Sequence, residues 1–358
     1  MRIAQIAPLY EAVPPGLYGG TERVIAALCD GLTGLGHDVT LFAASTSETA
    51  ARLEAVGPPL RERMSRHELT EVAPHLHLRM LADVYERALD FDVIHSHVDV
   101  WTLPFADRST TPSVLTMHGR LDTKYVQATL PLYPHVPLVS VSDSQRAPLR
   151  HASLRWAGTV HNGLELGHYQ AQPRPGGDHL AFVGRISPEK GPTLAVEVAR
   201  RTGRPLQMAA KVDPMDVEYF EQDVEPLVGG DVTFVGELDE VRKPAFFAGA
   251  AATLFPSDWP EPFGLVMIES LAAGTPVIAL RRGAVPEVLV DGVTGFICDD
   301  VDEMVDAVDR LPEVDPDACR ARARRFGAEA MCERYHEVYR SILATPVAEL
   351  TETAGSGR

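Results

Sequence analysis

The chain has 358 residues, of which 45% are hydrophobic and 23% charged, and its formal net charge is −17. This is the composition of a globular protein, which excludes extensive disorder and fibrous repeats, and the length suggests about two domains. The strong negative charge argues against nucleic acid as a partner and against strong association with anionic membranes.

The sequence contains no apolar run close to the ~20 residues of a membrane span, and its start, MRIAQIAPLY, is unlike a secretory signal. We therefore expect a cytoplasmic protein. No C-x-x-C pair occurs, so no disulfide framework is expected among the four cysteines, Cys29, Cys298, Cys319 and Cys332.

Short apolar runs alternate with amphipathic stretches through the first half of the chain. The runs predict strands at Ile3–Ala7, Val39–Phe42, Val93–His95, Ser113–Thr116 and Leu138–Val141. The stretches predict helices at Thr21–Leu35, Leu76–Leu89 and Asp143–His151. Residues 46–75 have no clear pattern, and we assign no element to them.

A second series of the same kind follows a segment rich in proline and glycine, Gln170–Gly177, which predicts a linker. Strands are predicted at Leu180–Val183, Leu206–Ala210, Val232–Val235, Ala252–Phe255, Pro276–Ala279 and Gly295–Ile297. Helices are predicted at Pro192–Arg201, Met215–Val228, Glu240–Ala248, Leu265–Ala273, Val301–Leu311 and Gly327–Leu343. The last residues, TETAGSGR, have the composition of a disordered tail.

Nearly continuous apolar strands that alternate with helices predict parallel sheets covered on both faces. We therefore expect an α/β protein with two Rossmann-like, doubly wound domains at residues 1–165 and 178–325, facing a central cleft. A C-terminal helix at 326–344 follows the second domain. Ligands of such sheets bind beyond the carboxyl ends of the strands, so the informative residues should directly follow strands.

Two glycines, Gly19 and Gly20, precede the first predicted helix. Glycines at a helix N-terminus let backbone amides approach a phosphate, and the helix dipole favours the anion. The spacing G-x-G-x-x-G is absent, so a dinucleotide cofactor is not indicated. An ordinary tight turn explains the two glycines equally well.

A loop with two cationic side chains, Gly184–Gly191 (GRISPEKG), follows the strand at Leu180–Val183. Arg185 offers a forked contact and Lys190, one of four lysines, a mobile point charge, a pair suited to a diphosphate. The alternative is a solvated loop in which Glu189 neutralises its neighbours.

Two carboxylates stand eight residues apart in Pro256–Ser270 (PSDWPEPFGLVMIES), which follows the strand at Ala252–Phe255. Prolines hold Glu261 in an extended loop, Gly264 opens a helix whose first amides are unpaired, and Glu269 lies about one turn into that helix. Carboxylates accept hydrogen bonds from vicinal hydroxyls such as those of sugars. The alternative is that Glu261 caps the helix and Glu269 is solvated.

A third feature is His118, which ends the strand at Ser113–Thr116 and precedes Gly119, a position typical of a cleft residue. The alternative is a satisfied structural histidine. The pair His95 and His97 shares one face of a strand, and Asp99 is nearby. No convincing third ligand follows, so no metal site is predicted.

These motifs together resemble the signature of retaining glycosyltransferases of family 4. The segment EPFGLVMIE carries the spacing Glu261-x7-Glu269, and GRISPEKG, GGTE, THG and AAGTPVIALRRGAVPEVLVDGVTGF occur in the order typical of that family. The resemblance extends from Met1 to about Leu343 and implies the GT-B fold.

The resemblance implies that Glu269 binds the ribose hydroxyls of a nucleotide sugar and that Arg185 and Lys190 hold its diphosphate. Backbone amides would assist the two cations at Gly264, Leu265 and Val266. The chain departs from the commoner pattern at 209–213, where the family usually has a glycine-rich loop.

The resemblance also implies that Glu261 and Phe263 contact the donor sugar, that Gly19 and Gly20 border the phosphates, and that His118 lies near the reacting carbon. The C-terminal helix would cross back to the first domain. Further candidate contacts are Lys211, Arg146 and Val235.

The resulting hypothesis is a metal-independent, cofactor-independent hexosyltransferase that retains the α-configuration, with UDP-glucose as donor and a soluble small molecule or saccharide as acceptor. Two alternatives stay open: a nucleotide-sugar epimerase or phosphorylase of similar fold, and a non-catalytic protein that binds nucleotide sugars. The residues do not identify the acceptor, the donor base or sugar, or the oligomeric state.

Overall fold

The computed structural model describes residues 1–170 and 177–344, which divide into two compact units. The first comprises residues 1–15, 19–164 and the chain from Ala328, and the second comprises 16–18 and 165–327. The chain thus enters the second unit at Glu165, ahead of the predicted linker. Residues 171–176 of that linker and the predicted disordered tail lie outside the described residues.

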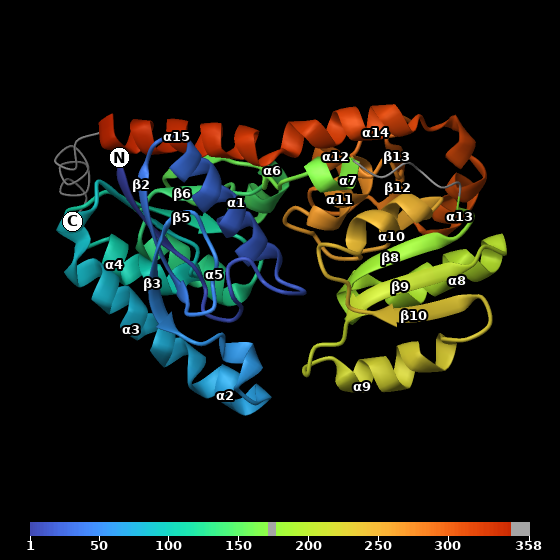
Figure 1. The fold of residues 1–358 in the computed structure, drawn as a ribbon, viewed down its shortest axis with the longest axis horizontal. Helices are drawn as coiled ribbons and strands as arrows, with labels where there is room; N and C mark the ends of the chain where they lie inside the picture. The colour runs from blue at the N-terminus through green and yellow to red at the C-terminus, as the bar shows by residue number, and fades with distance from the viewer. Residues whose placement is uncertain (171–176, 345–358) are drawn as a thin grey trace. The chain divides into compact units, whose positions relative to one another are not determined.

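The first unit is built on a seven-stranded parallel sheet with the order β3-β2-β1-β4-β5-β6-β7 (Figure 1). Its strands are β1 (Arg2–Ile6), β2 (Asp38–Ala44), β3 (Arg52–Gly57), β4 (Val93–Ser96), β5 (Ser113–Met117), β6 (Leu138–Ser140) and β7 (Trp156–Thr159). Its helices are α1 (Gly20–Gly34), α2 (Arg66–Glu71), α3 (Ala73–Glu86), α4 (Leu103–Ala106), α5 (Lys124–Thr129), α6 (Asp143–Arg146) and α15 (Ala328–Ala344).

The second unit is built on a six-stranded parallel sheet with the order β10-β9-β8-β11-β12-β13. Its strands are β8 (Leu180–Arg185), β9 (Leu206–Lys211), β10 (Val232–Gly236), β11 (Ala252–Phe255), β12 (Val277–Leu280) and β13 (Gly295–Cys298). Its helices are α7 (Gly167–Gln170), α8 (Pro192–Thr202), α9 (Val217–Tyr219), α10 (Lys243–Gly249), α11 (Leu265–Ala272), α12 (Val285–Val288), α13 (Val301–Asp309) and α14 (Pro316–Ala323).

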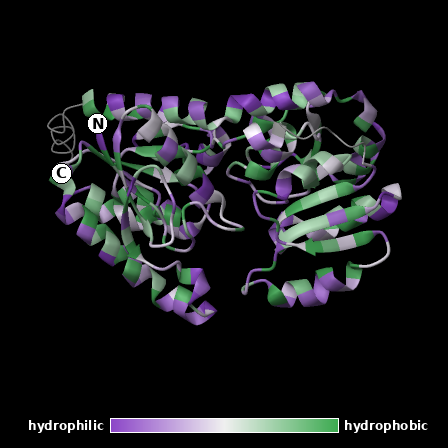
Figure 2. Ribbon diagram, viewed as in Figure 1, coloured by the Kyte–Doolittle hydropathy of each residue, from purple (hydrophilic) through white to green (hydrophobic). Residues whose placement is uncertain are grey.

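The predicted α/β class with two doubly wound parallel sheets is confirmed. Central strands such as β4, β5, β11 and β12 are buried along their whole length, because helices cover both faces of each sheet. Figure 2 shows hydrophobic residues concentrated in the strands, whereas the surrounding helices alternate hydrophobic and hydrophilic residues.

The structure differs from the predicted elements where exposure or proline weakens the pattern. The edge strand β3 and the helix α2 lie in the unassigned stretch 46–75, and neither buries a continuous face. The strand β7 and the helix α14 were not predicted. The predicted helix Met215–Val228 is instead a three-residue α9, a π-helical turn and a 3-10 turn that contains Pro226. The predicted helix Asp143–His151 is shortened to α6 followed by a 3-10 turn at Pro148.

The last helix, α15, belongs to the first unit although it follows the second unit in sequence. It packs along α1 and reaches β7. Its buried face includes Tyr335, Val338, Tyr339 and Ile342, and two of its tyrosine hydroxyls enter the interior of the first sheet. The helix α15 therefore completes the core of the first unit.

Candidate active site

The order of the second sheet changes direction between β8 and β11, because the chain adds β9 and β10 on one side of β8 and then returns to the other. The loops after β8 and β11 meet at this point, which is where doubly wound sheets bind ligands. The amide of Asp258 and the hydroxyl of Ser257 both donate to the carbonyl of Glu189, at 3.1 and 3.2 Å. The two loops are therefore held together.

Close packing of the two loops requires a glycine at position 191. Gly191 has φ +67°, and a Cβ there would lie 2.3 Å from the carbonyl oxygen of Pro256. A side chain would therefore force the two loops apart, so Gly191 lets the loops that carry Lys190 and Glu261 approach each other.

The ammonium of Lys190 and the carboxylate of Glu261 form an ion pair between these loops. The indole Nε1 of Trp259 donates to the same oxygen of Glu261 at 2.8 Å, and Lys190 Nζ lies 4.8 Å from the centre of the Trp259 ring. The side chains of Lys190 and Glu261 are only 16% and 12% exposed. Sequence reasoning predicted both charged residues but missed Trp259, which orients both.

Arg185 ends β8, beside Lys211 at the end of β9. Its guanidinium donates to Glu189 at 2.5 Å and lies 3.4 Å from Asp216. Burial disfavours the charged guanidinium, but the charges of Asp216 and Glu189 outweigh it and raise the pKa of Arg185. The neutralising Glu189 considered from the sequence is therefore present, and an incoming diphosphate would have to displace it.

The helix α11 begins at the same edge of the sheet. Its N-cap Gly264 has φ +87°, and no side chain caps the helix. This φ favours glycine, and a Cβ at Gly264 would also lie 2.6 Å from the flexible end of Met267 and 3.1 Å from Phe255 Cζ. Leu265 and Val266, the first two residues of the helix, are partly exposed, whereas Phe263 is buried against Phe326. The amides at this helix start can accept an anion.

Glu269 is 1% exposed rather than solvated. Its Oε1 accepts a hydrogen bond from the hydroxyl of Tyr169 at 2.6 Å, and Lys243 Nζ lies 3.4 Å away and also contacts Glu240. Burying a carboxylate requires such partners. Sequence reasoning missed Tyr169 and Lys243, although the scarcity of lysine in the chain could have drawn attention to Lys243.

In the first unit the sheet order changes direction between β1 and β4. Gly19 and Gly20 stand at the start of α1, and a Cβ on Gly19 would lie 2.7 Å from the ring of Pro15. The first turn of α1 contains the buried carboxylate of Glu22. Glu22 is itself an anion at the helix start, so this terminus is less suited to a phosphate than the start of α11.

His118 directly follows β5 and is partly exposed. Its Nε2 hydrogen-bonds to His97 Nδ1 at 2.8 Å. Both ring nitrogens of His95 and of His97 are engaged in hydrogen bonds. Within residues 1–170 and 177–344, no group of three or more His, Cys, Asp or Glu side chains is arranged to hold a metal ion.

The remaining candidates lie outside these groups. Arg146 donates to Ser140 Oγ at 2.6 Å and stacks on Trp156 at 4.8 Å, at the end of the first sheet nearest β7. Val235 is exposed on β10, the edge strand of the second sheet. Lys211 Nζ lies 5.7 Å from the ring centre of Tyr18, a residue that groups with the second unit.

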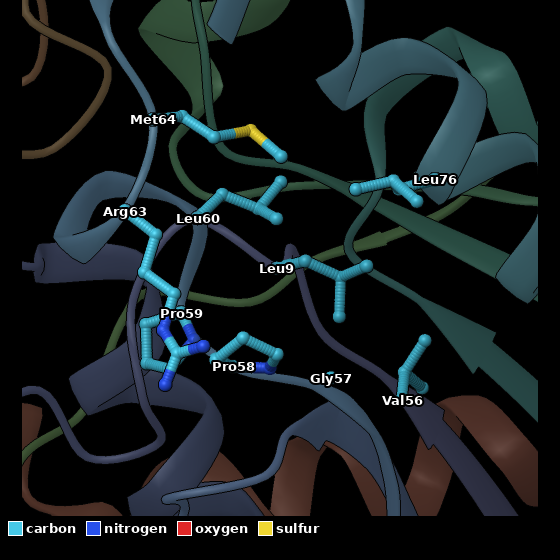
Figure 3. A pocket seen from close by; sticks show the side chains of 9 residues that line it. All are labelled: Leu9, Val56, Gly57, Pro58, Pro59, Leu60, Arg63, Met64 and Leu76. Carbon is cyan, nitrogen blue, oxygen red and sulfur yellow. The ribbon is translucent and has the colours of Figure 1, made fainter. Parts of the chain in front are cut away.

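A separate apolar pocket of about 200 Å³ lies in the first unit, between the end of β3 and the start of α3 (Figure 3). Arg63 is its charged lining residue, and the others are Leu9, Val56, Gly57, Pro58, Pro59, Leu60, Met64 and Leu76. None of the predicted site residues lines it, although Leu9 belongs to the loop that follows β1.

The chain matches known protein families along most of its length. Residues 18–166 match glycosyltransferase family 4, and residues 170–329 match glycosyl transferases group 1. The chain is 28% identical to a glycogen synthase of Mycobacterium tuberculosis over 90% of its length and 89% of the relative's. It is 29% identical to a D-inositol 3-phosphate glycosyltransferase of Kribbella flavida, with 92% of both chains covered. It is 26% identical to a phosphatidyl-myo-inositol mannosyltransferase of Mycobacterium leprae, covering 99% and 98%.

Solved structures show the same fold. AviGT4, a glycosyltransferase involved in avilamycin A biosynthesis, matches with a TM-score of 0.71 at 26% identity over 96% of this chain and 98% of that one. Anabaena Alr3699/HepE, solved in complex with UDP-glucose, matches with a TM-score of 0.73 at 17% identity over 95% and 100%.

Two doubly wound units in one chain, with cationic and acidic side chains at a switch point, define a glycosyltransferase of the GT-B fold. The chain belongs to glycosyltransferase family 4, as the resemblance of its motifs implied, and is a retaining enzyme that uses a nucleotide-sugar donor. Among its described residues, no helix is long and apolar enough to cross a membrane.

Proposed function

We propose that the enzyme transfers a hexose from UDP-glucose to a hydroxyl of a soluble small molecule or saccharide and forms an α-glycosidic bond. The observation that carries the assignment of the donor site is the pair Lys190–Glu261. This pair supports the proposal, because a cation that can bind phosphate and a carboxylate that can accept from sugar hydroxyls lie side by side at the switch point of the second sheet.

The donor would lie along the second unit. The buried carboxylate of Glu269 would accept hydrogen bonds from the ribose hydroxyls, and the amides of Gly264–Val266 would meet the phosphates together with Arg185 and Lys190. Glu261 and the backbone at Phe263 would contact the hexose. Because Lys190 is paired with Glu261, donor binding would exchange this ion pair for contacts to phosphate and sugar.

The chemistry depends on the charge of the leaving group. As the bond from C1 to the β-phosphate oxygen breaks, negative charge grows on that oxygen, and preorganised cations stabilise it. The acceptor oxygen would bond to C1 on the same face while its proton passes to the departing phosphate oxygen, so the configuration is retained. In the first unit, His118 would contact the sugar near C1, and Gly19 and Gly20 would border the phosphates.

Positive charge for the leaving group comes from side chains and amides of the chain itself. Arg185, Lys190 and the start of α11 together supply what a divalent cation supplies in other transferases, so we propose metal-independent transfer. The net charge of −17 favours a soluble acceptor over an anionic lipid surface.

The test is a panel of donors assayed for binding and turnover. UDP, GDP and ADP and their glucose and mannose derivatives are compared by thermal shift, because a ligand of the folded state raises the melting temperature. We expect the largest shift with UDP-glucose, and transfer to a saccharide panel that persists in EDTA. A larger shift with GDP-mannose would refute the donor. Conversion of the donor to another sugar without acceptor would identify an epimerase, and binding without any transfer would refute catalysis.

A further inference from the structure

A chain of buried polar side chains links His118 to the C-terminal helix within the first unit. His118 Nε2 contacts His97 Nδ1 at 2.8 Å, and His97 Nε2 contacts Gln5 Oε1 at 2.9 Å. The amide nitrogen of Gln5 donates to the hydroxyl of Tyr339 on α15 at 3.0 Å. Gln5 and Tyr339 are fully buried and His97 is 4% exposed.

The orientation of the Gln5 amide determines where the protons lie. His97 Nε2 faces a carbonyl oxygen, which only accepts, so this nitrogen carries the proton. Burial lowers the pKa of His97 well below its ordinary value and that of His118 to about 4, so both rings are neutral near pH 7. A neutral His97 then accepts at Nδ1, and His118 donates from Nε2.

Tyr339 holds the Gln5 amide in this orientation. Its hydroxyl accepts from Gln5 and donates to His95 Nδ1 at 2.7 Å, and His95 Nε2 donates to Thr116 at 2.7 Å. Each side chain in this network therefore has a hydrogen-bond partner. Rotation of the Gln5 amide would require every hydrogen bond in the network to exchange its donor and acceptor.

One ring nitrogen of these three histidines has no hydrogen-bond partner among the described residues. Of the six ring nitrogens of His95, His97 and His118, only His118 Nδ1 makes no hydrogen bond to the part of the chain that the structure describes. His118 is also the only one of the three that is more than 9% exposed. The network thus ends at His118 Nδ1, a hydrogen-bond acceptor on the most exposed of the three rings.

We propose that Gln5 and Tyr339 are positioning residues that hold His118 in its Nε2-protonated tautomer, so that Nδ1 accepts a hydrogen bond from a hydroxyl of the reacting sugars. The assignment of that hydroxyl rests on the proposed function, whereas the tautomer does not. The last helix of the chain then acts on the reaction through Tyr339 without touching substrate.

The tautomer is tested by nitrogen NMR of the whole protein labelled with 15N-histidine. In the wild type we expect His118 with a protonated Nε2 and an unprotonated Nδ1. Gln5→Leu and Tyr339→Phe should each give a mixture of tautomers at His118. The control is Tyr85→Phe, because the hydroxyl of Tyr85 on α3 donates to Ser113 Oγ at 3.2 Å, and neither residue belongs to the hydrogen-bonded network that reaches His118. A wild-type His118 protonated at Nδ1, or an unchanged tautomer in both variants, would overturn the proposal.

Steady-state kinetics test the consequence for transfer. Misorientation of a group at the reacting centre lowers kcat by roughly tenfold to a hundredfold, so we expect this loss in Gln5→Leu and Tyr339→Phe with the donor KM within about twofold. Tyr85→Phe, which also removes one tyrosine hydroxyl from the first unit, should keep the wild-type kcat. A changed tautomer with unchanged kcat would overturn the catalytic consequence at His118. Absence of transfer in the wild type would instead contradict the proposed function and leave the NMR result standing.

Discussion

The hydroxyl of Tyr169 donates to Oε1 of Glu269 at 2.6 Å, although the two residues are 100 positions apart. Tyr169 belongs to α7, the first element of the second unit, and Glu269 to the helix that follows the candidate phosphate site. The contact therefore links α7 to the carboxylate that we propose as the ribose ligand.

Tyr169→Phe removes this hydrogen bond without creating a cavity. A hydrogen bond to a charged group contributes roughly 1.5–3 kcal/mol, so we expect a loss of that size in the free energy of unfolding, together with weaker UDP binding. Urea denaturation and calorimetric titration with UDP measure the two effects. Tyr133→Phe, at a partly exposed tyrosine of the first unit, is the control and should change neither quantity appreciably. Unaltered UDP affinity in Tyr169→Phe would show that the tyrosine does not orient Glu269 for the nucleotide.

Glu269→Gln tests the ribose contact itself. Glutamine keeps the shape of the side chain but exchanges one accepting oxygen for a donor and removes the charge. We expect the dissociation constant of UDP to rise by about tenfold or more, because a charged hydrogen bond to a hydroxyl is lost. Affinity for UDP equal to that of the wild type would eliminate the ribose role of Glu269.

Arg185→Ala and Lys190→Ala test stabilisation of the leaving group. Each should lower kcat by roughly 10²-fold or more, since the cations act on charge that develops in the transition state. Arg201→Ala is the control, because Arg201 pairs with Glu197 and Asp302 on the exposed surface of the same unit. Near-normal turnover in both site variants would refute the diphosphate contacts, and a comparable loss in the control would point to a general effect of removing an arginine.

Gly191→Ala tests the close approach of the two loops. Gly191 and Gly203 flank α8 with similar φ values, +67° and +64°, so alanine costs about 1–2 kcal/mol of backbone strain at either position. Only at Gly191 does the added Cβ meet another loop, 2.3 Å from Pro256, whereas nothing lies within 4 Å at Gly203.

We therefore expect Gly191→Ala to weaken UDP-glucose binding and lower kcat, and Gly203→Ala to lower stability alone. Binding, turnover and melting temperature are measured for both variants. Equal effects on binding in the two variants would contradict the idea that loop spacing sets the site.

The buried histidines predict that stability falls in acid. Burial lowers the pKa of His118 from 6.5 to about 4, so between these values the unfolded chain binds a proton that the folded chain does not. The stabilisation is therefore complete above pH 6.5 and is lost as the pH falls toward 4. His95 and His97 contribute in the same direction, since burial lowers the pKa of both.

Urea unfolding at pH 7.5 and pH 5.0 measures this loss in the wild type and in His118→Gln. Since each pKa unit corresponds to about 1.4 kcal/mol, the variant should lose about 1–2 kcal/mol less than the wild type over this range. An identical loss in both proteins would show that His118 keeps an ordinary pKa in the folded state.

Local sequence determined the alternation of strands and helices, because buried strands such as Ala252–Phe255 are continuous apolar runs and amphipathic stretches such as Pro192–Arg201 carry a helical period. It also placed Arg185, Lys190, Glu261 and Glu269 directly after strands or at a helix start. Family 4 motifs supplied the class of reaction, since their order along the chain is itself a sequence property.

Tertiary structure decided what touches those residues. The contacts Tyr169–Glu269, Lys190–Glu261 and Gln5–Tyr339 join positions 100, 71 and 334 residues apart, and no local periodicity encodes a pairing over such distances. Tertiary structure also determined that β3 forms an edge strand and that the predicted helix breaks near Pro226. In both segments the hydrophobic pattern of the sequence is weak, because the backbone is half exposed or irregular. Only folding brings buried polar atoms to the partners that compensate their desolvation, so burial and charge pairing could be read only from the folded chain.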